Sequence, residues 1–351
     1  MRLCQQLFNY ARAFPLEPPL APIFACCSRV VEAFSQLMGQ LLVIANAAQS
    51  GPSAVRMAAT LEALRSTGWT VDCVLTRTAA EAMELTRRSG DYDLVVAAGG
   101  DGTVNGVASG LRRHASPAPL GILPCGTAND VARQLGIRNH PEAVAAIVRG
   151  SVRPLDLIEV QPAGESESRW ALNFAACGFA TELLRQTTPR LKRCLRPRFC
   201  YWVGFLAAIC RFRAPCLRIT VDGEVRIGSF FHVGAGNFER AGGGMMRHSP
   251  GAIPDDGLIE FCQVDALNRL EVLRYLPRLA RGTHPGMAQV RFGRGTEMSI
   301  ASDLPVPLAI DGEVDCVTTA ARIRVRPGAL RVMAPPTPIG TCAGQFSPPP
   351  D

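Results

Sequence analysis

Two short glycine-rich segments contain the residues of this chain best suited to chemistry. Residues 99–105 read GGDGTVN and residues 125–130 read CGTAND, and each follows a short apolar run. Glycines let a backbone approach a phosphate closely, and a helix start offers free N–H groups and the positive end of its dipole. Asp101 is suited to organising Mg²⁺ or its bound waters, because this ion prefers oxygen ligands. Together the segments predict a nucleotide phosphate site, whereas one alone would more often be a plain turn.

Two acidic turns in the second half of the chain are weaker signals. Residues 311–313 read DGE and residues 255–258 read DDGL. Each alone predicts only a change of chain direction, since such residues are common in turns. Asn129 and Asp130 likewise fit helix-capping roles.

Composition excludes several classes of protein. All but one of the 37 basic residues are arginine, the exception being Lys192. The lysine-containing phosphate loop is absent and Schiff-base catalysis is disfavoured. The 13 cysteines show neither C-x-x-C pairs nor zinc spacing, so we expect reduced thiols in a cytoplasmic protein. No run of 18 apolar residues predicts a spanning helix.

Strands and helices alternate in the first half of the chain. Its strands are almost wholly apolar, as expected for a parallel sheet covered on both faces. We expect strands at residues 41–45, 70–75, 94–98 and 120–123, and helices at about 52–67, 79–89, 101–113 and from 129. Ligands of open α/β sheets bind at the carboxyl ends of the strands, where both glycine-rich segments lie.

After residue 152 the apolar segments become short and alternating. Such segments lie at residues 217–221, 224–233, 258–264 and 323–325. They predict an antiparallel domain, so the expected fold class is α/β plus all-β: a parallel-sheet nucleotide-binding domain followed by an antiparallel β-sandwich-like domain. The expected divisions are an extension at 1–39, the α/β domain at 40–155, the β-rich domain at 156–334 and a proline-rich, disordered tail at 335–351.

Together these segments resemble the diacylglycerol kinase catalytic-domain family, particularly the soluble bacterial lipid kinases. GGDGT followed by GTAND at this distance is a specific signal. Other matching stretches follow in the family's order: residues 120–136, 156–157, 173–178 (NFAACG), 237–244, 254–257 (PDDG) and 310–313 (IDGE). The resemblance covers about residues 41–334. It implies ATP-dependent phosphorylation, with Mg²⁺, of a lipid hydroxyl on diacylglycerol or a related glycerolipid.

The resemblance also implies roles for individual residues. Glu313 matches the family's proton acceptor, and Asp101 and Asp156 are candidates for an acidic network between metal and catalytic site. Asp256 matches a ligand of a structural Mg²⁺, which Ile253 and Leu258 would bind through main-chain carbonyls. The implied nucleotide site comprises Asn46, Thr76, Gly100, Asp101, Gly102, Thr103, Val104, Asn105 and Thr127.

Two departures from the family pattern leave alternatives open. Ala47 replaces a proline that is usual in the first loop, and Gly106 replaces an acid. They are the only support for a catalytically silent lipid- or nucleotide-binding regulator. An NAD kinase-like enzyme also uses a GGDG loop, but a Gly-Ser-Thr-Ala-Tyr-type segment is missing.

A basic stretch with interleaved aromatic residues suggests a membrane contact. Residues 185–218 contain nine basic and no acidic residues. Such an element suits an anionic membrane surface at the inner face of the membrane, although a solvated flank around a packed helix fits equally well. Nucleic-acid binding is not expected, because no nucleic-acid motif accompanies the charge. The sequence leaves open whether the protein forms a homodimer.

Overall fold

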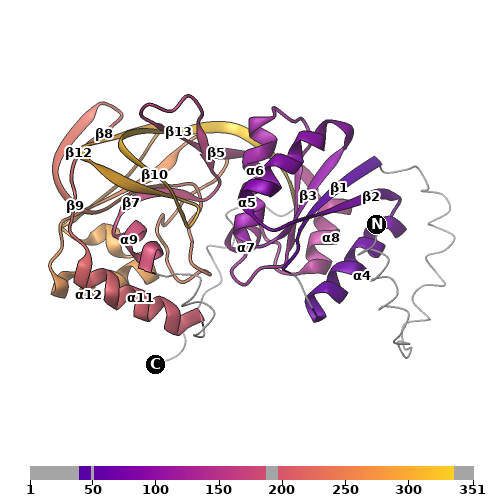
Figure 1. Ribbon diagram of the computed structural model, residues 1–351, viewed down its shortest axis with the longest axis horizontal. Helices are drawn as coiled ribbons and strands as arrows, with labels where there is room; N and C mark the ends of the chain where they lie inside the picture. The colour runs from indigo at the N-terminus through magenta and orange to yellow at the C-terminus, as the bar shows by residue number, and fades with distance from the viewer. Residues whose placement is uncertain (1–38, 49–50, 187–196, 336–351) are drawn as a thin grey trace.

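The computed structural model describes residues 39–48, 51–186 and 197–335. It has an N-terminal α/β part and a C-terminal part rich in antiparallel strands, side by side (Figure 1). The expected extension and tail, and the basic residues at 190–196, lie outside the described residues. Within the described residues, no helix is long and apolar enough to cross a membrane.

The N-terminal domain is built on four strands in the order β4-β3-β1-β2. They are β1 (Gly39–Asn46), β2 (Trp69–Thr76), β3 (Leu94–Gly99) and β4 (Leu120–Pro124). β1 pairs in parallel with β2 and β3, and β3 pairs in parallel with β4. All residues of β3 and β4 are buried, which accounts for their continuous apolar sequence.

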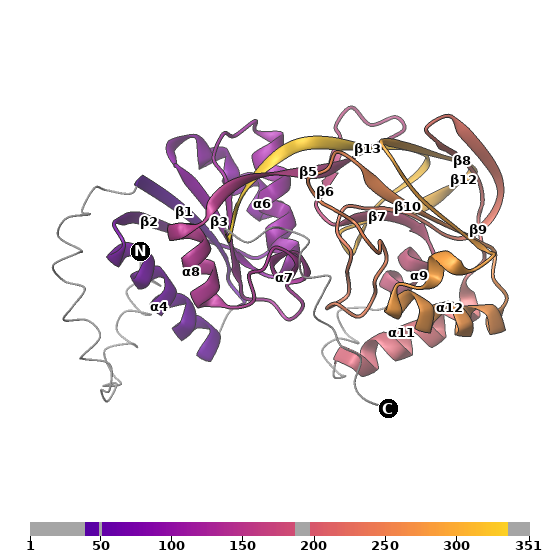
Figure 2. The ribbon, with the colours of Figure 1, turned by 180° about the vertical axis from the view of Figure 1, so that it is seen from behind.

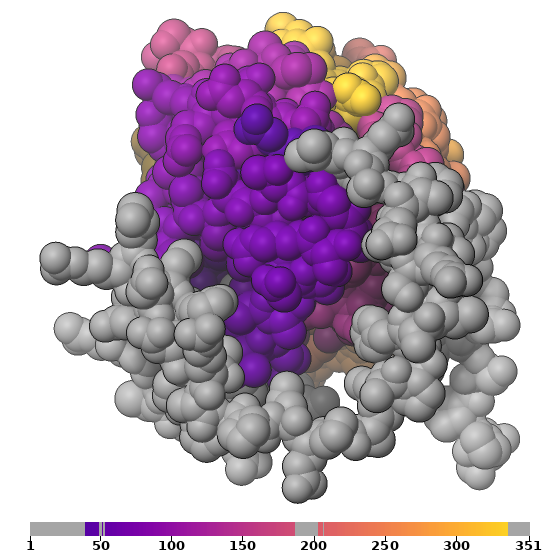
Figure 3. Space-filling model, turned by 90° about the vertical axis from the view of Figure 1, so that its right-hand side faces the viewer, coloured from indigo at the N-terminus to yellow at the C-terminus, as the bar shows by residue number. Residues whose placement is uncertain are grey.

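Helices cover both faces of this sheet (Figure 1). They are α4 (Pro52–Ser66), α5 (Ala79–Leu85) with the 3₁₀ turn Thr86–Asp91, α6 (Asp101–Arg113), α7 (Asp130–Gln134) and α8 (His140–Arg149). α4 packs beside α8, and α5 beside α6. The N-terminal domain faces the viewer in Figure 3.

Gly106 lies where α6 presses against α5. A Cβ built on Gly106 would lie 2.4 Å from the carbonyl oxygen of Ala79. Four residues along α6, a Cβ on Gly110 would lie 2.5 Å from the carbonyl oxygen of Met83. The glycine that replaces the family's acid is therefore a packing residue.

Most strands of the C-terminal domain pair antiparallel. They are β6 (Arg169–Ala171), β7 (Phe174–Gly178), β8 (Cys216–Val221), β9 (Glu224–Gly236), β10 (Ile259–Asp265), β11 (Val290–Gly295) and β12 (Glu297–Ile310). Both β7 and β8 pair with β9 and with β12, so these four strands close into a ring. An apolar cluster, including Phe230, Met298 and Ile323, fills this part of the domain.

Two long strands join the domains. They are β5 (Ser151–Pro162) and β13 (Glu313–Ala334), which pair antiparallel along most of their length. At its far end, Val332 of β13 pairs with Leu120 of β4. Figure 2 shows both strands crossing from one domain to the other. The division expected near residue 155 thus falls within β5.

Three helices lie against one side of the C-terminal domain (Figures 1 and 2). They are α9 (Phe179–Gln186), α11 (Pro197–Arg211) and α12 (Arg269–Arg281), followed by the 3₁₀ turn His284–Gly286. Phe179, Phe231 and Tyr275 belong to the aromatic cluster beneath them. The sequence pattern did not lead us to expect helices α9 and α12, so the description of the second domain as all-β leaves out helices that belong to it.

Candidate active site

The two glycine-rich loops touch each other at the carboxyl edge of the parallel strands. Cys125 donates its N–H to the carbonyl oxygen of Gly99 at 2.9 Å. A Cβ built on Gly126 would lie 2.4 Å from Cα of Gly100, so no side chain fits between the loops without movement. Asn129 secures this geometry by exchanging two hydrogen bonds with the backbone of Gly126, at 2.8 and 2.9 Å. The Asn129 side chain therefore hydrogen-bonds its own loop and does not cap helix α7.

Asp101 lies in the first turn of α6, between the two loops. Val131 donates its N–H to Oδ1 of Asp101 at 3.2 Å, which connects α6 to α7. The first amides of a helix lack partners within the helix, and its dipole is positive there. The loop edge therefore combines backbone donors for phosphate with one carboxylate that can face a cation.

The first loop contributes Asn46, whose Nδ2 donates to Oγ1 of Thr103 at 3.5 Å. Its Oδ1 accepts from Ala48 N–H at 2.8 Å, so Asn46 shapes the loop and also contacts the start of α6. Thr76 is buried, and its hydroxyl donates to the carbonyl oxygen of Thr78 at 2.9 Å. The structure therefore gives Thr76 a turn-forming role at the edge of the site.

The remaining residues of the implied nucleotide set differ in exposure. Val104 is buried in the core, which leaves only its backbone for a ligand. Asn105 accepts a 3.5 Å hydrogen bond from Ser109, whose hydroxyl also donates to the carbonyl oxygen of Trp170. Thr127 is exposed on the second loop.

Glu313 approaches this site from the other domain. It is the first residue of β13, and its carboxylate reaches the start of α6. A Cβ built on Gly102 would lie 3.8 Å from Oε1 of Glu313. Two segments more than 200 residues apart in the sequence are thus brought together. The side chain is exposed and could meet an acceptor hydroxyl.

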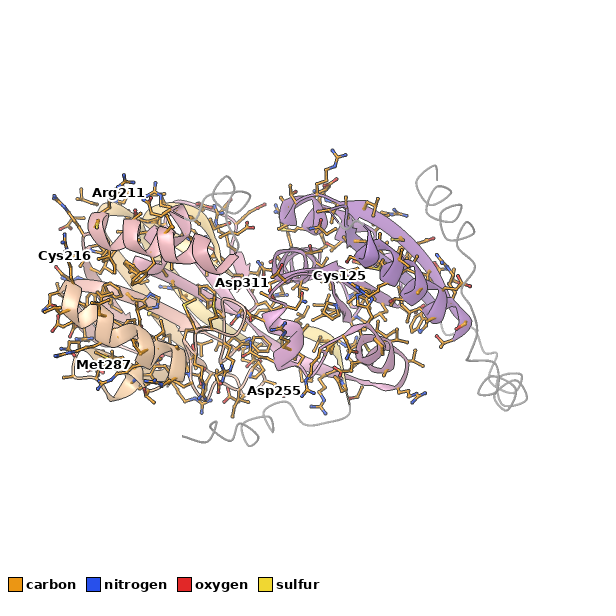
Figure 4. The ribbon with its side chains drawn as sticks, turned by 90° about the horizontal axis from the view of Figure 1, so that it is seen from below. Cys125, Arg211, Cys216, Asp255, Met287 and Asp311 are labelled. Carbon is orange, nitrogen blue, oxygen red and sulfur yellow. The ribbon has the colours of Figure 1, made fainter. Side chains whose placement is uncertain are left out.

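Asp311 holds the turn that carries Glu313. Its backbone has a φ of 45°, a left-handed conformation that aspartate tolerates. Its carboxylate accepts three N–H bonds, from Leu172, Asn173 and Phe174, at 2.7–2.8 Å. Burial raises the pKa of Asp311 to about 6; the three N–H bonds act in the opposite direction, and nearby Asp101 adds to the rise. Figure 4 shows Asp311 on the side of its domain that faces Cys125.

A further contact between the domains was not foreseen from the sequence. Asp130 accepts a 2.8 Å hydrogen bond from the N–H of Gly243. Gln134 exchanges two hydrogen bonds with the backbone of Arg240, at 3.0 and 2.8 Å. Burial raises the pKa of Asp130, and the charge of Asp101 acts in the same direction. The only sequence signal was the 237–244 match to the family.

The residues implied for a structural metal gather on a separate loop. Asp156 accepts from the N–H groups of Gly257 and Gly328, at 2.7 and 2.8 Å, and this fixes the loop. Burial raises the pKa of Asp156, with Asp256 adding to the rise. Asp101 instead lies near Asp130 and Asp311, so the described contacts do not join Asp101 and Asp156.

Arginine holds the carboxylate that the family pattern would give to Mg²⁺. Oδ2 of Asp256 forms an ion pair with Nη2 of Arg294, and Oδ1 accepts from Leu258 N–H at 3.0 Å. Nε of Arg294 also lies 3.0 Å from Oε1 of Glu260. Burial raises the pKa of Glu260 to about 7 despite this arginine. The residues at Ile253–Leu258 therefore do not fit a Mg²⁺ site while Arg294 remains there.

The loop edge fits Mg²⁺ only together with a nucleotide. Among the described residues, no three Asp, Glu, His or Cys side chains converge to hold a metal. Protein-bound Mg²⁺ with a nucleotide commonly needs one or two carboxylates, since phosphates and water complete its shell. Asp101 can supply one of these.

Comparisons with known proteins agree with this arrangement. Residues 40–160 match the model of the diacylglycerol kinase catalytic domain, and residues 183–334 match the YegS C-terminal NAD kinase beta sandwich-like domain. A diacylglycerol kinase of Staphylococcus saprophyticus is 30% identical over 64% of this chain and 71% of its own. One of Staphylococcus aureus is 31% identical over 64% of this chain and 69% of its own.

Solved structures show the same fold. A crystal structure of a diacylglycerol kinase from Bacillus anthracis has a TM-score of 0.63 at 20% identity, over 85% of this chain and 97% of that chain. A second from the same organism reaches a TM-score of 0.68 at 21% identity, over 85% and 97%. The two family models together match both domains in sequence, and the fold matches over 85% of the chain. The chain belongs to the diacylglycerol kinase family.

Proposed function

We propose that this protein is an ATP-dependent lipid kinase, with the hydroxyl of diacylglycerol or a related glycerolipid as phosphoryl acceptor. The observation that carries the proposal is the position of the Glu313 carboxylate beside Gly102, at the start of α6. It brings a proton acceptor from one domain to the phosphate-binding loop of the other. Phosphoryl transfer needs mainly positioning and charge neutralisation, so glycine loops can serve without a loop lysine.

The two loops would hold the nucleotide. The amides at the start of α6 and the backbone of the second loop would face the phosphates, while Asn46 and Thr127 would border them. Asp101 would hold the nucleotide's Mg²⁺, directly or through water. When bound, MgATP supplies the transferable phosphoryl group and the charge that neutralises it.

Glu313 would act as general base. It takes the proton of the acceptor hydroxyl as that oxygen forms its bond to the γ-phosphorus, and the bond from that phosphorus to the ADP oxygen breaks. Asp311, tied to three backbone N–H groups, fixes the turn and so acts as a positioning residue.

The acceptor class implies work at a membrane surface. A glycerolipid lies in a bilayer, so the enzyme would bind peripherally at the cytoplasmic face of the membrane. Its phosphorylated product would enter phospholipid metabolism. The expected basic stretch is only partly described, since residues 187–196 lie outside the described residues. Within it, Arg185, Arg211 and Arg213 line a hollow of about 490 Å³.

Two observations weaken the alternative functions, a silent regulator and an NAD kinase-like enzyme. Gly106, offered for a silent regulator, contacts α5, away from the loop edge. An NAD kinase-like activity would share the sandwich fold, but the curated relatives reported above carry the name diacylglycerol kinase.

A panel of acceptors with labelled ATP tests the proposal. We expect Mg²⁺-dependent labelling of diacylglycerol or a related glycerolipid, and none of NAD. Asp101→Asn should abolish labelling while the circular dichroism spectrum and melting temperature stay close to wild type. Labelling of NAD alone, or full activity of folded Asp101→Asn, would overturn it.

A further inference from the structure

Helix α12 has one face in the core and another that is apolar and basic. Val272 and Tyr275 are buried against the aromatic cluster. The N-terminus of the helix is stabilised, because Asn268 and Glu271 form a reciprocal capping box. Its outward face was not singled out in the sequence.

Two leucines lie on that outward face. Leu270 is 72% exposed and Leu273 is 58% exposed. Their spacing of three residues puts both on one side of the helix. Neighbouring exposed leucines keep apolar area in water, which favours burial against another surface.

Arginines surround these leucines. The exposed residues of α12 include Arg269, Arg274, Arg278 and Arg281. They form no ion pair with any residue that the structure describes. The single acid of the helix, Glu271, accepts hydrogen bonds at 2.8 Å from Asn268 N–H and at 3.2 Å from Gln289. The outward face therefore carries a net positive charge.

The C-terminal end of α12 adjoins the loop that reaches the candidate active site. Arg247 donates its N–H to the carbonyl oxygen of Leu279 at 3.1 Å, and its Nη1 to that of Arg281 at 3.2 Å. The same arginine forms a 2.8 Å ion pair with Glu239. Arg240, which follows Glu239 in the chain, donates its N–H to Oε1 of Gln134 in α7. The basic face thus lies on a segment connected to the loop edge of the N-terminal domain.

Other exposed apolar side chains lie on the elements nearby. Val203 of α11 is 46% exposed, and Met245 of the 237–251 loop is 49% exposed. α11 and α12 lie on the same side of the C-terminal domain in both ribbon views, and Figure 4 looks onto that side.

We propose that the outward face of α12 docks on an anionic lipid bilayer, with Leu270 and Leu273 entering the interface and the four arginines contacting headgroup phosphates. The choice of partner rests on charge complementarity, since leucines ringed by arginine match the apolar and anionic layers of such a surface. It also rests on the proposed function, which requires the active site to meet a membrane lipid.

Vesicle sedimentation tests this surface with the full-length protein. The probes are vesicles of phosphatidylcholine with and without phosphatidylglycerol, at low and high salt. We expect the wild type to bind the anionic vesicles only, and less so at high salt. Arg274→Gln, Arg278→Gln and Arg281→Gln together should weaken binding about fivefold per arginine. Leu270→Gln with Leu273→Gln should weaken it about tenfold or more.

Matched changes elsewhere serve as controls. Arg65→Gln, Arg87→Gln and Arg88→Gln remove three exposed arginines of the N-terminal domain. Val225→Gln with Ile227→Gln replaces two exposed apolar residues, 50% and 61% exposed, at the β8–β9 hairpin. Both control proteins should bind vesicles as the wild type does.

Activity separates this proposal from the proposed function. With a short-chain diacylglycerol in detergent micelles, the α12 variants should turn over at the wild-type rate. Vesicle binding that depends on α12, in a protein without lipid phosphorylation, would support the surface and overturn the function. Unchanged binding by the α12 variants would overturn the surface. So would light scattering that shows a dimer made monomeric by the α12 changes, since the face would then bind a second copy.

Discussion

The carboxylate of Glu313 lies against Gly102, so that a Cβ built on this glycine would be 3.8 Å from Oε1. Gly102 belongs to the first turn of α6, whose amides would face phosphate. The relationship places a carboxylate of β13 beside the loop where the proposed phosphoryl transfer would occur.

Glu313→Gln keeps the size of the side chain and removes the base. We expect kcat to fall by about 10²–10⁴, with little change in ATP affinity. Asp315→Asn, two residues along β13, is the matched control, because Asp315 pairs with Arg169 outside the site. Equal kcat for wild type and Glu313→Gln, with chemistry shown to limit the rate, would leave Glu313 a turn residue.

Gly102→Ala tests the space between the domains. A distance of 3.8 Å is ordinary van der Waals contact, so the protein should fold normally. The added methyl would take up space between the helix start and Glu313 where the phosphates are expected, and should lower kcat by roughly ten- to a hundredfold. Gly90→Ala, where no atom lies within 4 Å, should leave kcat unchanged. Wild-type turnover in Gly102→Ala would contradict close approach at this point.

Gly106→Ala should destabilise the protein without a specific effect on catalysis. Its Cβ would lie 2.4 Å from the Ala79 carbonyl oxygen, so α5 and α6 must separate. Overpacking of this kind costs about 1–3 kcal/mol. Urea denaturation measures the loss, again with Gly90→Ala beside it. An unchanged unfolding free energy would show that the two helices part easily.

The Arg294 ion pairs predict a loop that does not need Mg²⁺. Without nucleotide, the melting temperature of the wild type should be the same in Mg²⁺ and in EDTA. Arg294→Ala leaves Asp256 and the buried Glu260 without their cation and should cost about 1–3 kcal/mol. Mg²⁺ should recover part of that loss. A wild-type melting temperature that drops in EDTA would show that metal, and not arginine, holds this loop.

Three histidines, of which His284 is fully buried, predict a stability contribution that is lost in mild acid. Burial lowers the pKa of His232 and His284 to about 4 and that of His248 to about 3. The unfolded chain therefore takes up more protons below about pH 6.5. The histidine contribution to the unfolding free energy should fall from there toward pH 4, by up to about 1.4 kcal/mol per histidine per pH unit. The raised pKa values of Glu260 and Asp311 act in the opposite direction and reduce the net loss. Urea unfolding at pH 7 and pH 5 measures this, and His284→Phe should shrink the difference. An equal difference in that variant would contradict the assignment.

The parts of the fold that the sequence revealed are those with a strong local pattern. β3 and β4 are wholly buried, and their apolar runs mark them clearly. α12 was missed although Asn268 and Glu271 have the spacing of a capping box; Pro277 inside it argues against a helix, since proline usually breaks one. The family, recognised from GGDGT and GTAND, was confirmed by the relatives.

Long-range contacts explain what the sequence could not reveal about the site. Asp311 looked like an ordinary turn acid, yet its partners lie 137 to 139 residues away. Nothing in the sequence indicated a role for Arg294, because it lies on β11 and its partner Asp256 is 38 residues away, on the loop before β10. Residue roles in the nucleotide site stay predictions, to be tested by the variants above.

The β5–β13 pair also determines where the connection between the two domains can bend. Its register shifts between Arg326 and Leu330, where Gly328 has a φ of 58°. Asp156 binds this bulge and the neighbouring loop at once. On either side the two strands are continuously paired and stiff. A hinge motion that separates Glu313 from α6 would therefore bend at the bulge, and Asp156 would set the resting angle.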